Sequence, residues 1–339
     1  MTAYAVTMRD SSPVRTLSLY GAVGLLDDPF PRDPQAGSYV PLTRQTTVLA
    51  GVRDWLGSTG DGAPGLAVVA GEAGSGKTRL LEQLVLAIAD DDRLIGVVPD
   101  DGARRTDAHL LRSAIVSLGG SPAGRTGLEL TNELRDILDA HREDSLPPVL
   151  LIDNAALTGS QLEILRGVLT APGATPEPTR VHIVLFGPPA LPDRIARRRA
   201  LVERTRFIAT IPPLDVDAAR MLLGGRIDAV RDRGTSEANT TGPFIRDQAL
   251  TIMLDASNGS PGGLLALAHL AVREAIATGQ RHVDALTAEA VTQVVPAQGE
   301  ESQRALASVD PVIQTRLSLP GVDDADAPVS ASRRRGRQR

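Results

Sequence analysis

The chain has 339 residues, of which 42% are apolar and 23% charged, values that are ordinary for a globular protein of about two domains. The absence of cysteine excludes disulfides, thiolate zinc sites, iron–sulfur clusters and cysteine nucleophiles, and five scattered histidines argue against a His-based metal site. One Trp, three Tyr and four Phe are too few for stacking on single-stranded nucleic acid, and a net charge of -5 argues against a basic coat that binds nucleic acid.

The amino-terminal region shows no periodic pattern. Residues 1–40 are rich in Pro, Gly and Asp, which predicts an extended arm outside the core. A helix is expected from Leu42 to Leu56. The sequence shows neither the apolar core of a signal peptide nor a run of about 18 apolar residues, so we expect a cytoplasmic protein without a membrane span.

Short apolar runs then alternate with helical patterns. The runs predict five strands, at residues 66–70, 94–98, 149–152, 181–186 and 206–211. The intervening patterns predict helices at residues 78–89, 106–118, 128–141 and 160–169. Strands that are apolar on both faces and separated by helices indicate an α/β domain, here over residues 41–213, with a parallel sheet covered by helices on both faces.

The strand signal stops near residue 214. Four further helices are predicted at residues 215–231, 244–256, 261–277 and 284–295, with Asp215 as an N-cap. They indicate a small all-helical domain over residues 214–298. Residues 299–339 have no periodicity and predict a disordered tail. Its end, residues 333–339, carries five Arg. They could bind nucleic acid or an acidic partner surface, or they could simply be solvated and have no function.

The strongest motif is GEAGSGKT, residues 71–78, which fits G-x-x-x-x-G-K-[ST] between an apolar strand and an amphipathic helix. Small residues let backbone N–H groups converge on phosphate, and the helix N-terminus favours the anion. Lys77, the one lysine among 36 basic residues, would reach the β- and γ-phosphates of ATP, and the Thr78 hydroxyl would hold Mg²⁺. The predicted nucleotide-binding residues are Gly71, Glu72, Ala73, Gly74, Ser75, Gly76, Lys77, Thr78 and Arg79.

A second motif, PPVLLIDNA over residues 147–155, places Asp153 at the end of a buried strand, where a Walker-B aspartate contacts Mg²⁺. The next residue is usually a glutamate that activates water, but here it is Asn154. An amide can position a water molecule but cannot accept its proton. We therefore predict catalytic roles for Lys77, Asp153 and Asn154, with either slow hydrolysis or another carboxylate, such as Glu72 or Glu163, as the base.

Between the last two predicted strands lies a group of arginines. Guanidinium groups bind phosphate through two parallel hydrogen bonds, so in a ring or filament one of them could reach ATP held by a neighbouring subunit. A solvated helix face is the alternative interpretation. The candidates are Arg197, Arg198, Arg199, Arg204 and Arg206.

The order of these pieces resembles the ExeA-type AAA+ ATPases, the general secretion pathway protein A group, and is similar to the TniB-like ATPases of transposition. The likeness covers most of residues 19–295. It rests on "LYGAVGLLDDPFPRDPQAGSYVPLTRQ", on the two motifs above, on "VHIVLFGPPALPDRIARRRA", on "IPPLDVDAARMLL" and on "SNGSPGGLLALA".

The resemblance implies a five-stranded parallel sheet with a helical lid, ATP between them, and a homo-oligomer in which a neighbour's arginine completes the site. This chain departs from the pattern at three places. Asn154 replaces the Walker-B glutamate, Gly187 stands at the first sensor position, and the Gly263–Leu264 region stands where a second-sensor arginine is expected.

These observations lead to three functional hypotheses. The first is an AAA+ ATPase whose nucleotide state controls oligomerisation and partner binding. The second is a DNA-binding regulator of transposition or recombination of the TniB type, which the arginine-rich stretch and the tail favour. The third is a scaffold that binds ATP and scarcely hydrolyses it.

Overall fold

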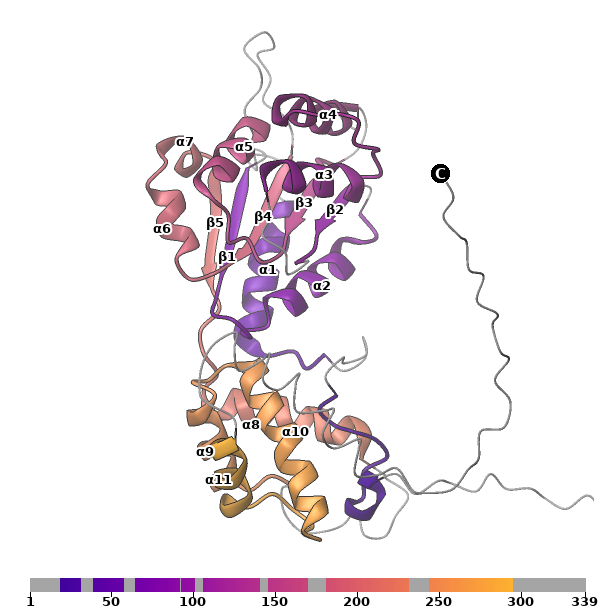
Figure 1. Ribbon diagram of the computed structural model, residues 1–339, viewed down its shortest axis with the longest axis vertical. Coiled ribbons are helices and arrows are strands. Elements are labelled where there is room, and N and C mark those ends of the chain that lie inside the picture. The colour runs from indigo at the N-terminus through magenta and orange to yellow at the C-terminus, as the bar shows by residue number, and fades with distance from the viewer. Residues whose placement is uncertain are drawn as a thin grey trace, which may run out of the picture. The chain divides into compact units, whose positions relative to one another are not determined.

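A computed structural model describes residues 19–31, 39–57, 65–91, 93–100, 106–140, 146–169, 181–231 and 244–294 (Figure 1). The predicted tail over residues 299–339 lies outside these ranges. Within them, no helix is both long and apolar enough to cross a membrane. The strands are β1 (Leu66–Ala70), β2 (Ile95–Val98), β3 (Val149–Ile152), β4 (His182–Gly187) and β5 (Thr205–Thr210). The helices are η1 (Leu19–Val23), α1 (Thr43–Gly57), α2 (Lys77–Ile88), α3 (Asp107–Ser117), α4 (Gly127–Ala140), α5 (Gly159–Leu169), α6 (Leu191–Ala196), α7 (Arg199–Val202), α8 (Val216–Val230), α9 (Asp247–Ala256), α10 (Pro261–Ala277) and α11 (Ala285–Val294).

The five strands form one parallel sheet in the order β2-β3-β4-β1-β5. Because all strands run the same way, their carboxyl ends meet at one edge, which is where ligands bind in open α/β sheets. Strand β1 lies between β4 and β5, so the segment that follows β1 emerges in the interior of that edge. The predicted parallel sheet covered on both faces is confirmed.

Two hydrophobic cores, one on each face, hold the sheet between its helices. Alternate residues of β1 point to opposite faces. Leu66 and Val68 pack with α3, α4, α5, α6 and α7, whereas Ala67 and Val69 pack with α1 and α2. Every residue of β1, β3 and β4 is buried, as their continuous apolar sequences predict, but β5 is an edge strand with alternating exposure.

The predicted elements begin and end within three residues of the observed ones. The exceptions are η1, α6 and α7, which the sequence did not predict because helices of five, six and four residues are too short to show a period. They divide the arginine-rich stretch, so Arg197 and Arg198 lie in the turn between them.

The helical part, α8 to α11, has a third core of its own. Asp215 caps α8, as predicted, by accepting a hydrogen bond from the Ala218 N–H at 2.8 Å. Leu25 and Phe30 belong to this core and are only 2% and 3% exposed. The expectation that residues 1–40 stay outside the core is therefore wrong for these two side chains.

The segment around Leu25 is held to the helical part by polar contacts as well. The Leu26 N–H donates to the Val230 carbonyl at 2.8 Å, and Asp28 lies 2.9 Å from His269 on α10. Burial by itself would raise the pKa of Asp28, but the contact with His269 and the hydrogen bond from the Phe30 N–H lower it below the ordinary value. The Pro- and Asp-rich composition hid this packing because its few apolar side chains, the buried Leu25 and Phe30 and the partly buried Tyr20 and Val23, follow no regular period.

Candidate functional site

The glycine-rich loop connects β1 to α2 at the carboxyl edge of the sheet. Gly74 and Gly76 have φ angles of 74° and 92°, a region that favours glycine. A Cβ on Gly71 would lie 2.6 Å from the Ser75 Oγ, so the loop also needs glycine for space. Within the described ranges the Ser75 hydroxyl is buried and has no hydrogen-bond partner. The loop thus has the geometry and an unsatisfied donor that suit a phosphate group.

Lys77, the first residue of α2, folds back over this loop. Its Nζ donates to the carbonyl oxygens of Gly71 at 2.9 Å and Glu72 at 2.7 Å. Burial lowers the pKa of Lys77, while the negative charges of Asp153 and Glu72 act in the opposite direction. The ammonium group is therefore held at the mouth of the loop, where a triphosphate would be bound.

Thr78 and Asp153 meet in the structure although 75 residues separate them. The Thr78 hydroxyl donates to Asp153 Oδ2 at 2.7 Å, and Asp153 is 4% exposed. A hydroxyl and a carboxylate are the hard oxygen ligands that Mg²⁺ takes together with substrate phosphates. These two residues fit a magnesium ion, which they would hold beside the loop.

Asn154 turns the chain sharply after Asp153. Its φ is 44°, in the left-handed region that Asn tolerates, and its N–H donates to Asp153 Oδ1 at 2.9 Å. Its side-chain Nδ2 donates to Asp100 Oδ2, at the end of the neighbouring strand, at 2.8 Å. Of the predicted substitute bases, Glu163 pairs with Arg166 at 2.6 Å, and Glu72 lies in the phosphate loop, where its backbone carbonyl accepts a hydrogen bond from Lys77.

Neither of the two predicted sensor positions carries a polar side chain. A Cβ on Gly187 would lie 2.5 Å from Leu191 Cδ2 and 3.1 Å from the Ala155 carbonyl oxygen. A Cβ on Gly263 would lie 3.2 Å from the Ser257 Cβ, and Leu264 is fully buried in the helical core. A larger residue at Gly187 would therefore require its neighbours to move.

The amino end of α10 contacts the phosphate loop directly. The Gly262 N–H donates to the Gly74 carbonyl at 2.9 Å, and the Ser260 hydroxyl donates to the Ala73 carbonyl at 3.3 Å. A Cβ on Gly262 would lie 3.1 Å from the Gly74 Cα. The sequence predicted a helix that begins at residue 261; the structure adds a contact between the start of this helix and the phosphate loop.

A buried cation lies in the helical part near this loop. Arg226 on α8 is 6% exposed, and its Nε has no hydrogen-bond partner within the described residues. Burial lowers the pKa of Arg226, and the nearby charge of Arg79 lowers it further. Arg79, the last residue of the predicted nucleotide set, pairs with Glu82 at 2.5 Å. Two cations therefore come close to each other beside the loop.

The arginines of the predicted trans group differ in exposure and in pairing. Arg199 pairs with Glu203 at 2.9 Å, and Arg198 lies 3.8 Å from Glu163. Arg204 is half-buried. Arg197 and Arg206 are exposed, and no acidic side chain in the described ranges forms an ion pair with them.

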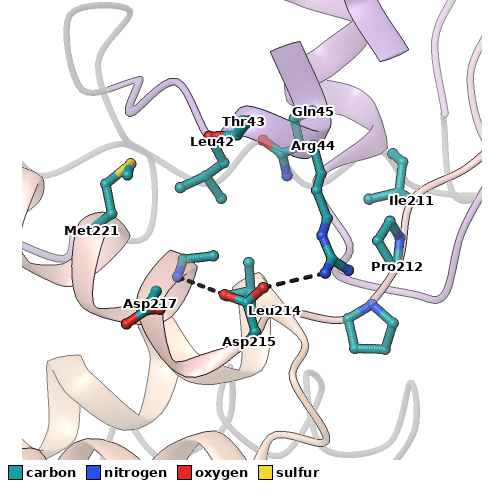
Figure 2. Close-up of a pocket in the computed structure, with 12 residues that line it drawn as sticks. Leu42, Thr43, Arg44, Gln45, Ile211, Pro212, Leu214, Asp215, Asp217 and Met221 are labelled. Atoms are coloured by element: carbon teal, nitrogen blue, oxygen red, sulfur yellow. Dashed lines mark hydrogen bonds and ion pairs between the residues drawn. The ribbon is translucent and has the colours of Figure 1, made fainter. Parts of the chain in front are cut away.

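A cleft of about 250 Å³ opens beside the loop, between the start of α1, the segment after β5 and the start of α8. Figure 2 shows the ion pair across it, Arg44 to Asp215 at 3.3 Å. Leu42, Leu214 and Met221 form the apolar part of the wall of this cleft. Gln45, which also lines the cleft, donates to the Ser75 carbonyl at 3.3 Å and so connects the cleft to the phosphate loop.

Asp100 was missed in the sequence, and the contact that Ser260 and Gly262 make with the phosphate loop was not predicted. Asp100 carries the same signal as Asp153, an apolar strand followed by an acidic residue, so the pattern around residues 95–100 could have found it. The contact of Gly262 with Gly74 has no such signal because it joins residues almost 190 positions apart.

Comparisons with known proteins place these features in a wider context. A family model described as "AAA domain" matches residues 61–195. No curated protein sequence matches the chain.

Several solved structures have a similar fold. Cdc6p from Pyrobaculum aerophilum is 18% identical with a TM-score of 0.63 and covers 83% of this chain and 74% of its own. The ORC2 protein of Aeropyrum pernix, in its ADPNP-ADP complexes, is 17% identical with a TM-score of 0.58 and covers 87% and 76%. The ORC1 protein of Aeropyrum pernix, in complex with DNA, is 15% identical with a TM-score of 0.56 and covers 84% and 71%. At these identities the likeness is one of fold.

Proposed function

We propose that this chain, which has the AAA+ P-loop NTPase fold, is a cytoplasmic ATPase whose nucleotide state controls its oligomerisation and its hold on a partner. The observation that carries the proposal is the hydrogen bond that the Thr78 hydroxyl donates to the Asp153 carboxylate beside Lys77. Residues 41–213 would form the nucleotide-binding domain and residues 214–298 its lid. Because the residue after Asp153 is an amide, hydrolysis would be slow unless a carboxylate elsewhere in the site accepts the proton of the attacking water.

Each part of the site has a role in binding ATP. The loop N–H groups and Lys77 would hold the β- and γ-phosphates, and Arg79 and Arg226 add positive charge beside them. Thr78 and Asp153 would hold Mg²⁺, which neutralises phosphate charge when bound. We assign the adenine base of ATP to the cleft beside Gln45. An apolar wall with a few polar groups, as this cleft has, is typical of sites that bind small molecules.

Control of assembly requires that the assembled state contact ATP in a way the free subunit does not. Arg197 and Arg206 are the candidates that best suit contact with a neighbour's nucleotide. Both are exposed, and no acidic side chain in the described part of the chain forms an ion pair with either. A ring or filament in which one of them reaches the next subunit's γ-phosphate would satisfy this requirement.

Phosphate release by wild type and Lys77→Ala tests the enzymatic part. We expect slow release from wild type and none above background from the variant, with ATP affinity measured in parallel. ATP binding by a wild type that releases no phosphate would favour the scaffold hypothesis. Sedimentation with ATP, ADP and no nucleotide tests assembly, and identical sizes in all three would contradict it.

The assignment of the adenine base to this cleft has its own test. Ala218→Trp would fill part of the cleft, so it should weaken ATP binding more than it weakens binding of inorganic triphosphate. Equal weakening of both would contradict the assignment.

DNA binding is the second candidate function. The similar Aeropyrum pernix ORC1 protein was solved in complex with DNA, and the chain resembles the TniB-like group that serves transposition. Arg197 and Arg206 offer unpaired positive charge in the described part. Gel-shift titration on duplex DNA at two salt concentrations, with and without ATP, tests it, since phosphate contacts weaken steeply with salt. No shift at low salt would exclude this candidate.

A further inference from the structure

Two polar side chains lie side by side at the corner where β2 and β3 end. The strands pair in parallel with Val98 opposite Ile152, so the residues two positions further on, Asp100 and Asn154, are neighbours as well. Asn154 Nδ2 donates to Asp100 Oδ2 at 2.8 Å. The sheet register therefore brings a carboxylate to the amide that replaces the usual glutamate.

The chemistry of this pair fixes how the amide faces. A carboxylate only accepts hydrogen bonds, so the nitrogen of Asn154 must point to Asp100. The amide oxygen is then the group with which Asn154 can accept a hydrogen bond from water. An amide cannot take a proton from that water, whereas a carboxylate can. Together the two side chains hold both capacities that a single glutamate would supply.

We propose that Asp100 is the carboxylate that accepts the proton of the attacking water, while Asn154 orients that water. The inference rests on the ATPase activity proposed above and names the base it uses. The water oxygen forms a bond to the γ-phosphorus as the bond from that phosphorus to the bridging oxygen breaks. The electron pair leaves on ADP, the water proton passes to Asp100, and inorganic phosphate is the other product. Asp100 then returns the proton to solvent.

The backbone supports this role at Asn154. A φ of 44° is tolerated by Asn and Asp but strained for Glu and other side chains. The fold at this corner thus disfavours a glutamate at residue 154 and keeps the carboxylate one strand away. Of the acids considered from the sequence, Glu163 pairs with Arg166 and Arg198 instead.

Asp100→Asn is the direct test. The rate of phosphate release should fall by roughly 10²-fold or more, the usual contribution of a general base, because the substitution removes the proton acceptor and keeps the shape. The dissociation constant for ATP and the melting temperature should stay unchanged. Asp136→Asn, the same substitution on the exposed surface of α4, serves as the matched control and should keep the wild-type rate.

The exchange variant Asp100→Asn with Asn154→Asp separates catalysis from structure. It moves the carboxylate across the same hydrogen bond to a position whose φ Asp tolerates, so the rate should recover to within about tenfold of wild type. Equal rates in wild type and Asp100→Asn would overturn the assignment and leave the ATPase proposal standing. A loss that the exchange does not restore would also overturn it, and a wild type that releases no phosphate would overturn both.

Discussion

The sheet part and the helical part of this protein contribute to the candidate site in different ways. In the sheet part, the phosphate loop is one continuous stretch, and Asp100 and Asp153 follow strands that end at the same edge. The helical part contributes through contacts between distant residues, such as the Ser260 hydroxyl on the Ala73 carbonyl. The candidate residues of the sheet part are therefore recognisable from local sequence patterns, whereas those of the helical part depend on how it packs.

The same contrast extends to the cores. The sheet cores are built from the strands and the helices that connect them. The helical core also takes in Leu25 and Phe30, which lie almost 200 residues before α8. Trp55, the one tryptophan, packs in the sheet part and reports on it separately.

The largest effect is expected from removing an aromatic ring from the helical core. Phe30→Ala should lower the free energy of unfolding by about 4 kcal/mol, because Phe30 is 3% exposed and truncation leaves a cavity. Circular dichroism at 222 nm should show the loss, with a smaller shift in Trp55 fluorescence. Leu26→Ala, in the same segment but 56% exposed, is the control and should cost under about 0.5 kcal/mol. A loss in Phe30→Ala as small as that in Leu26→Ala would show that burial of Phe30 does not stabilise the helical part.

Lys77→Arg should weaken ATP binding strongly while leaving both parts folded. A guanidinium is too broad for the place where Nζ contacts the Gly71 and Glu72 carbonyls, so we expect ATP affinity to fall by roughly 10²-fold, or about 3 kcal/mol. Equilibrium titration with a fluorescent ATP analogue measures it, and the melting temperature should not change. Arg166→Lys exchanges the same two residue types on the surface of α5, so it is the control and should leave ATP affinity unchanged. Unchanged affinity in Lys77→Arg would contradict the role assigned to this lysine.

These differences explain what the sequence could predict. Continuous apolar strands, helical periods and the glycine loop are local, so the parallel sheet, the phosphate loop and Asp153 could be placed from the sequence. The hydrogen bond from Asn154 to Asp100 depends on strand register, and the contact of Gly262 with Gly74 depends on how α10 packs. Phe30 was missed because its segment has no period, although Phe30, Leu25 and the contact of Asp28 with His269 all join the segment to the helical part.

Mild acid should destabilise the sheet part selectively. His182 at the start of β4 is 2% exposed and packs edge-on against Trp55 with ring centres 4.7 Å apart. Burial, with the nearby charge of Arg93, lowers its pKa from 6.5 to about 4. The unfolded chain therefore binds a proton that the folded chain does not, so stability is complete above pH 6.5 and falls by about 3 kcal/mol as the pH drops towards 4.

Urea unfolding followed by Trp55 fluorescence between pH 7 and pH 4.5 measures this loss. His182→Leu should flatten the dependence, whereas His109→Gln, on the exposed surface of α3, should leave it as in wild type. If His182→Leu shows the wild-type slope, other groups control acid stability.

The smallest effect is expected where the two parts meet at the phosphate loop. In Gly262→Ala the new methyl group would lie 3.1 Å from the Gly74 Cα and 3.3 Å from its carbonyl oxygen, so either the loop or α10 must shift by a few tenths of an ångström. We expect a cost of about 1 kcal/mol. Gly224→Ala in α8 is the matched control, because nothing lies within 4 Å of its Cβ position and the added methyl should stabilise the helix by roughly 0.5–1 kcal/mol.

Melting temperatures measure both effects. A lower melting temperature in Gly262→Ala together with a higher one in Gly224→Ala would show that the cost of Gly262→Ala arises in the contact with Gly74 and not from helix propensity. The contact also predicts how that cost depends on ligand. If the Gly262 N–H leaves the Gly74 carbonyl when ATP binds, saturating ATP should abolish the difference between Gly262→Ala and wild type. A difference that persists in ATP would mean that α10 stays on the loop in both states, and the helical part would then transmit nucleotide state by some other contact.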